Sequence, residues 1–305
     1  ENNWLGQGKK VGFEFSASAE SVSGELSYSN PNYDLLGNSI RYNLYNVTND
    51  KPDQGYENRL FSAGVGTSFE QYKNIFTNLG LNISYDDLKT LSNASSSLKK
   101  QSGEFTEISA DYGFRLDLRN RKFMPTDGSI TGFGQTLPLA ADKPYIGNTF
   151  THSTYHSFSE NLIGAGKLFL SSVHGLDNED VRISKRKSLS SKRLRGFERG
   201  KVGPVDGSDH IGGNYVAALN FEANLPNFLP ETTNTDIGLF LDFANVWGVD
   251  YDETLGESNK LRSSTGVAAN WLSPIGPMTF VFSTNLSKAE TDVTESFNFN
   301  IGTTF

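Results

Sequence analysis

The chain has 305 residues, a formal net charge of −8, no cysteine and 12% aromatic residues, including 22 Phe and 12 Tyr. The lack of cysteine excludes thiol chemistry and disulfide bonds, and the acidic balance disfavours a nucleic-acid partner. No run approaches the ~18 apolar residues of a transmembrane helix. The abundance of Phe and Tyr favours β-structure.

Alternation of apolar and polar residues with period two predicts strands along the whole chain. The segment Glu107–Asn120 shows it most clearly, with apolar residues at even positions 108 to 118 and charged, polar or glycine residues at odd positions. Such strands exceed the ~5–6 residues usual in soluble proteins. We predict about 14 strands, over residues 8–17, 20–30, 37–47, 57–70, 76–87, 103–118, 128–138, 146–160, 161–173, 213–225, 236–246, 262–272, 277–286 and 295–305.

The connections between the predicted strands largely alternate in length. Three are long, at Asp87–Ser102, Gly175–Gly212 and Gly248–Lys260, whereas Ser159–Asn161 and Ser273–Pro277 are tight turns. Long loops on one side and short turns on the other are typical of a membrane barrel. We therefore expect an all-β protein, an antiparallel transmembrane β-barrel with its long loops outside the cell. A soluble multi-sandwich protein or a lectin-like barrel is the alternative.

Aromatic residues near the ends of predicted strands favour the membrane barrel, because such barrels carry aromatic girdles at both membrane interfaces. These residues are Trp4, Tyr72, Phe76, Tyr112, Trp247 and Trp271.

No catalytic or metal-binding constellation is recognisable in the sequence. His152 and His156 would share a strand face about 13 Å apart, at ~3.3 Å per residue, which is too far for one zinc ion. The adjacent carboxylates Asp86 and Asp87 lie at a loop edge, where we expect them to be exposed to solvent. The sequence therefore predicts a protein that is not an enzyme and that needs no cofactor or metal.

The segment Lys185–Lys201 carries eight of the 27 basic residues. At its centre, Leu194, Arg195, Gly196 and Phe197 frame a cation with two large apolar side chains and a glycine. This sequence suits neither a free surface nor an apolar core, because a buried charge needs a partner. From the spacing alone, Arg195 is either a solvated loop cation or a buried one that requires carboxylates.

Six segments occur in the order found in the BamA family, the outer-membrane β-barrel assembly factors of Gram-negative bacteria, which the chain resembles over its whole length. They are RNRKFMPTDGS (119–129), LRGF (194–197), GGN (212–214), LDFANVWG (241–248), WLSPIGP (271–277) and FNFNIGTTF (297–305). The resemblance implies a 16-stranded barrel preceded by periplasmic POTRA domains. Because about 14 strands are present, we expect residues 1–305 to be an N-terminally incomplete barrel without POTRA domains.

The resemblance also implies that the long extracellular loop, residues 175–213, folds back into the barrel lumen. The family pairs the arginine of its loop motif with two carboxylates, which match Glu222 and Asp242 here. The strand alternation points both of them inward. Gly196 would allow a tight turn beside the wall. Leu194 and Phe197 would pack against lumenal aromatic residues such as Phe240.

The family inserts β-barrel proteins without ATP at a lateral seam between its first and last strands. The resemblance thus implies an insertase in the outer membrane of a Gram-negative bacterium. Its partners would be unfolded outer-membrane proteins, lipids including lipopolysaccharide, and lipoproteins that bind mostly through the POTRA domains. The expected seam and C-terminal insertion signal comprise Phe297, Phe299, Ile301, Gly302 and Phe305. A two-partner-secretion transport pore of the same superfamily is the main alternative, and a passive porin or a surface enzyme is a weaker one.

Overall fold

The computed structural model describes residues 2–4, 6–18, 20–122, 124–226, 228–252, 255, 260–273 and 276–301. Gly302 and Phe305 of the expected seam lie outside the described residues, as does the side chain of Ile301. None of the helices within these ranges has the length and apolar character to cross a membrane.

The strands are β1 (Asn2–Trp4), β2 (Lys9–Ala17), β3 (Ser21–Asn30), β4 (Ser39–Lys51), β5 (Tyr56–Tyr72), β6 (Ile75–Thr90), β7 (Gly103–Asp117), β8 (Gly128–Ala141), β9 (Tyr145–Ser159), β10 (Leu162–Gly175), β13 (Tyr215–Leu225), β14 (Thr235–Trp247), β15 (Arg262–Ser273), β16 (Gly276–Ser287) and β17 (Phe297–Ile301). The connections contain the short helices η1 (Pro52–Gln54), α1 (Ser96–Lys99), η2 (Ile183–Lys185) and η3 (Glu231–Thr233), and the hairpin of β11 (Val205–Asp206) and β12 (Asp209–His210).

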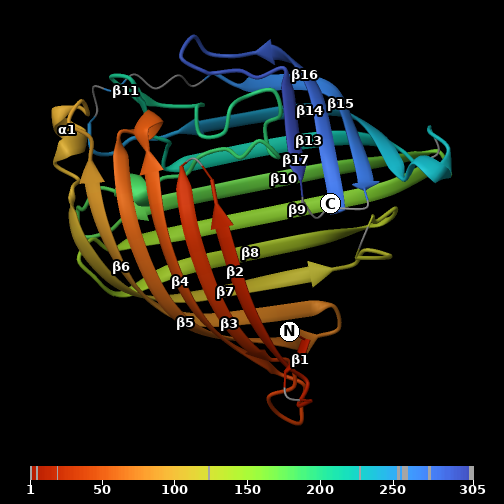
Figure 1. Ribbon diagram of the computed structural model, residues 1–305, viewed down its shortest axis with the longest axis horizontal. Helices are drawn as coiled ribbons and strands as arrows, with labels where there is room; N and C mark the ends of the chain where they lie inside the picture. Colours follow the sequence, from red (N-terminus) through yellow and green to blue (C-terminus); the bar gives the residue numbers. More distant parts are fainter. Residues whose placement is uncertain are drawn as a thin grey trace.

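One antiparallel sheet holds all the long strands. Over the described residues it has 15 strands, and each pairs with the next in the chain except that β10 pairs with β13 across the longest connection. Figure 1 shows the sheet curving round to enclose a lumen. The 14 predicted strands correspond one to one to the strands of this sheet from β2 onward, and the described residues add the three-residue β1 and the short hairpin of β11 and β12. The predicted fold class is therefore confirmed.

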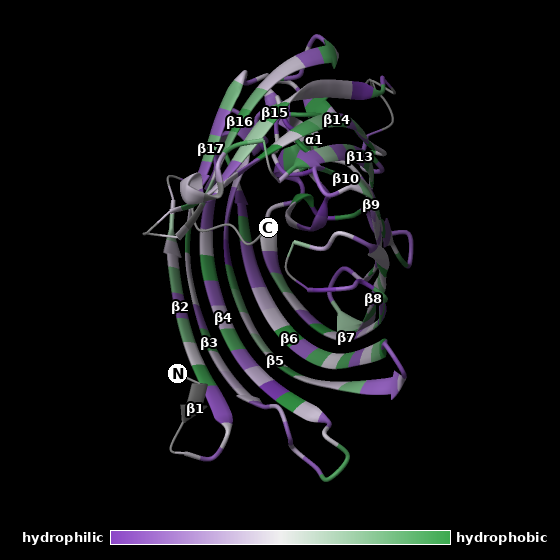
Figure 2. Ribbon diagram, turned by 90° about the vertical axis from the view of Figure 1, so that its right-hand side faces the viewer, coloured by the Kyte–Doolittle hydropathy of each residue, from purple (hydrophilic) through white to green (hydrophobic). Residues whose placement is uncertain are grey.

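The two faces of the sheet differ as the alternation predicted. On β6, Leu79, Leu81 and Ile83 face outward and are 46%, 51% and 48% exposed. Between them, Asn82 donates to the carboxylate of Asp111 on the neighbouring β7. Figure 2 shows this alternation of hydrophobic and hydrophilic residues along the strands. An apolar exterior of this extent is unfavourable in water and suits a lipid environment, which excludes the soluble alternative.

The aromatic girdle is only partly as expected. Tyr72 is exposed at the end of β5, and Trp247 at the end of β14 stacks on Tyr215 of β13 with ring centroids 5.6 Å apart. Phe76 does not have the environment expected of a girdle residue, because the guanidinium of Arg115 lies 4.9 Å from its ring centroid. A charged neighbour of this kind indicates the polar inner face of the barrel rather than a lipid interface.

The three long connections meet at one end of the barrel. Ser97 of α1 donates to Asp252 of the β14–β15 connection, and Ser95 donates to Asp206 of the β10–β13 connection. A buried apolar cluster joins the same segments and includes Leu98, Ile183 and Ile211. Since successive strands are antiparallel, the turns at Ser159–Asn161 and between β15 and β16 lie at the opposite end. We call the first end the capped end and the second the turn end.

The first and last strands come round to the same side of the barrel in both views (Figures 1 and 2). In the described part of the chain, β17 forms a ladder with β16 alone, through five residue pairs. The interior ladders of the sheet are much longer, with 16 pairs between β5 and β6. All five described residues of β17 are thus paired with β16, and within the described residues no strand pairs with the other edge of β17.

Candidate functional site in the barrel lumen

The β10–β13 connection, residues 176–214, docks on the inner wall formed by β13 and β14. Leu194 and Phe197 are each 1% exposed. They belong to a buried cluster with Leu189 and Val202 of the connection and with Val216, Ala218, Ala244 and Val246 of the wall. Burying a large apolar side chain contributes about 1.5–3 kcal/mol. These apolar contacts therefore hold the connection inside the lumen.

Gly196 lies where a larger residue would not fit. Its φ of +87° is in the left-handed region, and a Cβ there would come within 3.1 Å of the Ser283 hydroxyl on β16. Its carbonyl accepts a 2.8 Å hydrogen bond from the Asn285 side chain, also on β16. The glycine thus lets the motif turn while its backbone touches the wall near the last strand.

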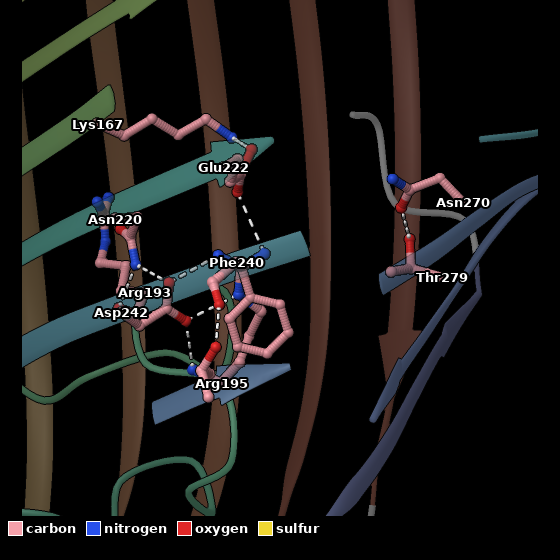
Figure 3. Close-up of polar contacts among 10 residues, drawn as sticks. Lys167, Arg193, Arg195, Asn220, Glu222, Phe240, Asp242, Asn270 and Thr279 are labelled. Atoms are coloured by element: carbon pink, nitrogen blue, oxygen red, sulfur yellow. Dashed lines mark hydrogen bonds and ion pairs between the residues drawn. The ribbon is translucent and has the colours of Figure 1, made fainter. Parts of the chain in front are cut away.

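Arg195 lies between the two carboxylates that the sequence suggested. Its Nη2 and Nε lie 2.6 and 2.8 Å from the two oxygens of Asp242, and its Nη1 lies 3.2 Å from Glu222. The backbone N–H of Arg195 also donates to Asp242 at 3.1 Å. Figure 3 shows these side chains converging from β13, β14 and the loop. The contact with Asp242 is bidentate, a geometry that arginine can form and lysine cannot.

Further groups complete this network. Lys167 of β10 donates to the second oxygen of Glu222 at 2.6 Å, and Asn220 donates to Asp242 at 2.8 Å. The Arg195 guanidinium lies 3.8 Å from the ring centroid of Phe240. Burial acts to lower the pKa of Arg195, but the hydrogen bonds and charge of Asp242, with those of Glu222, outweigh it and hold that pKa above its usual value. The loop therefore keeps its charge inside the lumen.

Two expectations from the sequence are wrong in detail. Phe240 does not pack with Leu194 and Phe197, because it lies beneath the Arg195 guanidinium and clusters with Ala268 and Val281 instead. Asp86 is not exposed: it is 2% exposed and accepts hydrogen bonds from Asn58 and Ser184. The alternation gives the face of a strand, but it does not show that the folded loop fills the lumen beside it.

A second ion network, which the sequence analysis missed, anchors the start of the loop. Arg182 lies 3.5 Å from Asp86 and 3.1 Å from Glu107, and all three side chains are nearly inaccessible to solvent. The guanidinium also lies 4.5 Å from the ring centroid of Phe105. The only signal in the sequence was that acidic residues stand at inward positions of predicted strands.

A third network, also missed, holds the connection between β16 and β17. Arg262 of β15 lies 2.9 Å from Asp292, and both side chains are fully buried. Asp292 also accepts a hydrogen bond from the backbone N–H of Ala289 at 2.6 Å. No periodic pattern marks Asp292, because it lies between strands.

A cavity of about 630 Å³ lies in the lumen beside the Arg195 network. Its lining includes Lys167, Arg195 and Glu222, together with Asn298 and Asn300 of the last strand. Within the described ranges, no group of three or more His, Asp or Glu residues could hold a metal ion. The cavity is therefore a lumenal space of mixed polar and apolar lining that reaches the last strand.

The two seam residues whose side chains are described, Phe297 and Phe299, lie on the same face of β17. Phe297 is 48% and Phe299 40% exposed on the outer face. Their rings lie 5.0 and 4.9 Å, centroid to centroid, from Phe282 and Phe280 of β16. Ile301 pairs with Met278 at the end of the described ladder.

The fold and the lumenal loop define an outer-membrane β-barrel with an inserted loop, and comparison with known proteins agrees. The Omp85 superfamily domain matches residues 3–305. The outer membrane protein assembly factor BamA of Neisseria meningitidis is 24% identical, over all of this chain and 44% of that protein. The sorting and assembly machinery component 50 homolog of Bos taurus is 25% identical, over 82% of this chain and 55% of that protein.

Solved structures of related barrels also match this chain. BamA from Haemophilus ducreyi, in a form that lacks POTRA domains 1–3, matches with a TM-score of 0.87 and 25% identity, over 98% of this chain and 65% of that one. CdiB from Acinetobacter baumannii matches with a TM-score of 0.62 and 11% identity, over 97% of this chain and 53% of that one, which shows a shared fold.

The chain belongs to the Omp85 superfamily. Within it, the chain is similar to the C-terminal barrel region of BamA and is an outer-membrane protein of a Gram-negative bacterium. It spans less than half the length of the curated BamA proteins that it matches.

Proposed function

We propose that this chain is the membrane barrel of an insertase, which folds β-barrel proteins into the outer membrane at the seam between its first and last strands. The observation that carries the proposal is the last strand, β17, which pairs with β16 alone through five residues in the described part of the chain. A strand that is paired on one edge only offers the backbone donors and acceptors of its other edge to an incoming strand. The similarity to BamA, an assembly factor by name, supports the same role.

Clients of such an insertase would be unfolded outer-membrane proteins, and the reaction needs no catalytic group. A client strand would add to the free edge of β17, and the backbone hydrogen bonds formed there would template its next strand. Outer-membrane lipids, including lipopolysaccharide, would surround the barrel. Lipoprotein subunits would bind mostly through POTRA domains upstream of this barrel. Residues 176–214 would be the extracellular loop that fills the lumen.

A reconstitution experiment tests this function. Lipid vesicles containing the folded full-length protein receive a urea-unfolded copy of the same chain, which is itself an outer-membrane barrel, with a fluorescent tag. We expect the tagged copy to reach the compact, heat-modifiable form several-fold faster than in empty vesicles. Equal rates in the two kinds of vesicle would refute the insertase.

The transport pore is the second candidate, and the lumenal cavity beside the docked loop favours it. In that case residues 176–214 would plug a channel through which one dedicated client passes. Deleting Lys192–Lys201 and recording single-channel conductance separates the two functions. A large and stable opening would indicate a pore, whereas small, irregular openings are expected of an insertase.

A further inference from the structure

The segment that leads into the last strand is held by contacts from three parts of the barrel. This segment, residues 288–296, connects β16 to β17 at the capped end, and we call it the entry segment. Its polar contacts come from β15, from β16 and from the lumenal loop. The strand that follows has a ladder of five described pairs. These contacts suggest that the entry segment fixes the start of β17.

The strongest of these contacts is the buried pair of Arg262 and Asp292. Both side chains have no solvent exposure, and the guanidinium donates to both carboxylate oxygens, from Nε at 2.9 Å and from Nη2 at 3.0 Å. Its remaining nitrogen donates to the Lys260 carbonyl at 3.0 Å and to the Asn245 side chain. A buried bidentate pair with these added hydrogen bonds has one favourable geometry, so it fixes the entry segment on β15.

The lumenal loop holds the same segment by backbone hydrogen bonds. Phe197 and Thr294 form an antiparallel bridge. On one side of it, the backbone N–H of Glu198 donates to the Val293 carbonyl at 3.0 Å, and on the other side the backbone N–H of Glu295 donates to the Gly196 carbonyl at 3.1 Å. His210 of β12 also lies 2.9 Å from the Thr291 carbonyl. The loop that carries Arg195 is thus joined directly to the start of the last strand.

We propose that Arg262 and Asp292 are positioning residues that fix the register in which β17 presents its edge to a client strand. This inference rests on the proposed insertase function. A shift of one residue in a strand exchanges its inner and outer faces, so a template strand must have a defined start. The buried pair supplies that start at the capped end, while one edge of β17 has no pairing strand within the described residues.

Cross-linking measures the register directly, because the chain has no cysteine of its own. The folded full-length protein carries Phe297→Cys, and the probe is an unfolded copy of the same chain with one cysteine at each of residues 297 to 301 in turn. We expect one dominant cross-linked position. In the Arg262→Gln/Asp292→Asn variant we expect cross-links to spread to positions two residues away, since these share a face.

The matched control is Lys143→Gln/Glu179→Gln, which removes an exposed 3.0 Å ion pair at the same end of the barrel. It should keep the single cross-linked position. If the double variant of the buried pair does not reach the membrane, Asp292→Asn alone retains one acceptor oxygen for Arg262 and gives a smaller spread. A single, unchanged position in a folded variant of the buried pair would overturn the proposal.

A second readout separates this proposal from the insertase function. Nitroxide labels on Lys99→Cys of α1 and Glu290→Cys of the entry segment, both exposed sites, report their distance by electron paramagnetic resonance without any client. We expect a narrow distribution that broadens in the Arg262→Gln/Asp292→Asn variant. An unchanged distribution would refute the positioning role. A broadened distribution, in a protein that cross-links no client at all, would refute the insertase and leave the anchoring of the entry segment standing.

Discussion

Arg195 is the residue through which the lumenal loop and the barrel wall depend on each other. Its guanidinium bonds to Asp242 through two nitrogens and to Glu222 through the third. Its carbonyl accepts a hydrogen bond from Ser264 of β15. One residue of the loop therefore touches three consecutive wall strands. If the loop leaves the lumen, Asp242 loses the cation with which it is paired, whereas Glu222 keeps Lys167.

Removing the guanidinium should destabilise the barrel. Arg195→Ala leaves Asp242, which has no solvent exposure, without its cation, and breaking a well-buried pair costs about 3–5 kcal/mol. Arg195→Lys should recover only part of this loss, because the bidentate geometry is absent. Urea unfolding followed by heat-modifiable gel migration measures the difference. Arg193→Ala is the matched control, because the Arg193 guanidinium lies on an aromatic ring, 3.2 Å from the ring centroid of Phe169. An equal loss of stability in Arg193→Ala would argue against the network.

Charge reversal tests whether the contacts act as pairs. Arg195→Glu alone should abolish client folding, because it places three carboxylates together. Adding Asp242→Arg or Glu222→Arg should restore part of the activity if each pair interacts in the working protein. Client folding in vesicles is the measurement. A double variant that behaves as the sum of its two single variants would show no coupling.

At the scale of single elements, β17 combines an apolar outer face with an amide-lined inner face. Phe299→Asp places a charge on the lipid side and should cost about 1–2 kcal/mol, below the ~2–4 kcal/mol of a basic residue at the membrane midplane. Asn298→Asp, one position away and lining the cavity, is the control and should cost less. The yield of folded protein in membranes measures both. Equal yields would mean that the two faces of β17 do not differ as described.

Period-two alternation was sufficient to predict the strands, because every long strand has one face to lipid and one to the lumen. The family resemblance, rather than the alternation, suggested which carboxylates meet Arg195. The pairs of Arg182 with Glu107 and of Arg262 with Asp292 could not be predicted. They join residues 75 and 30 positions apart, and each depends on where an irregular connection comes to lie inside the barrel.

The whole molecule has two unlike ends, and their orientation in the membrane can be tested. We expect the capped end, with its long connections, to face the cell exterior. Lys99→Cys should react with a membrane-impermeant maleimide on intact cells. Leu35→Cys, in the fully exposed β3–β4 turn at the opposite end, should react only after the membrane is permeabilised. The reverse pattern would invert the topology.

The packing of the long connections at the capped end has a consequence for the cell envelope as well as for the barrel. Any wide barrel is a potential leak in a membrane that serves as a sieve against toxic solutes. Here the apolar contacts of Leu98, Ile183 and Ile211 join the long connections at the capped end, and the cavity lies beside the Arg195 network. We expect a variant that loses these apolar contacts to admit large antibiotics that the envelope normally excludes.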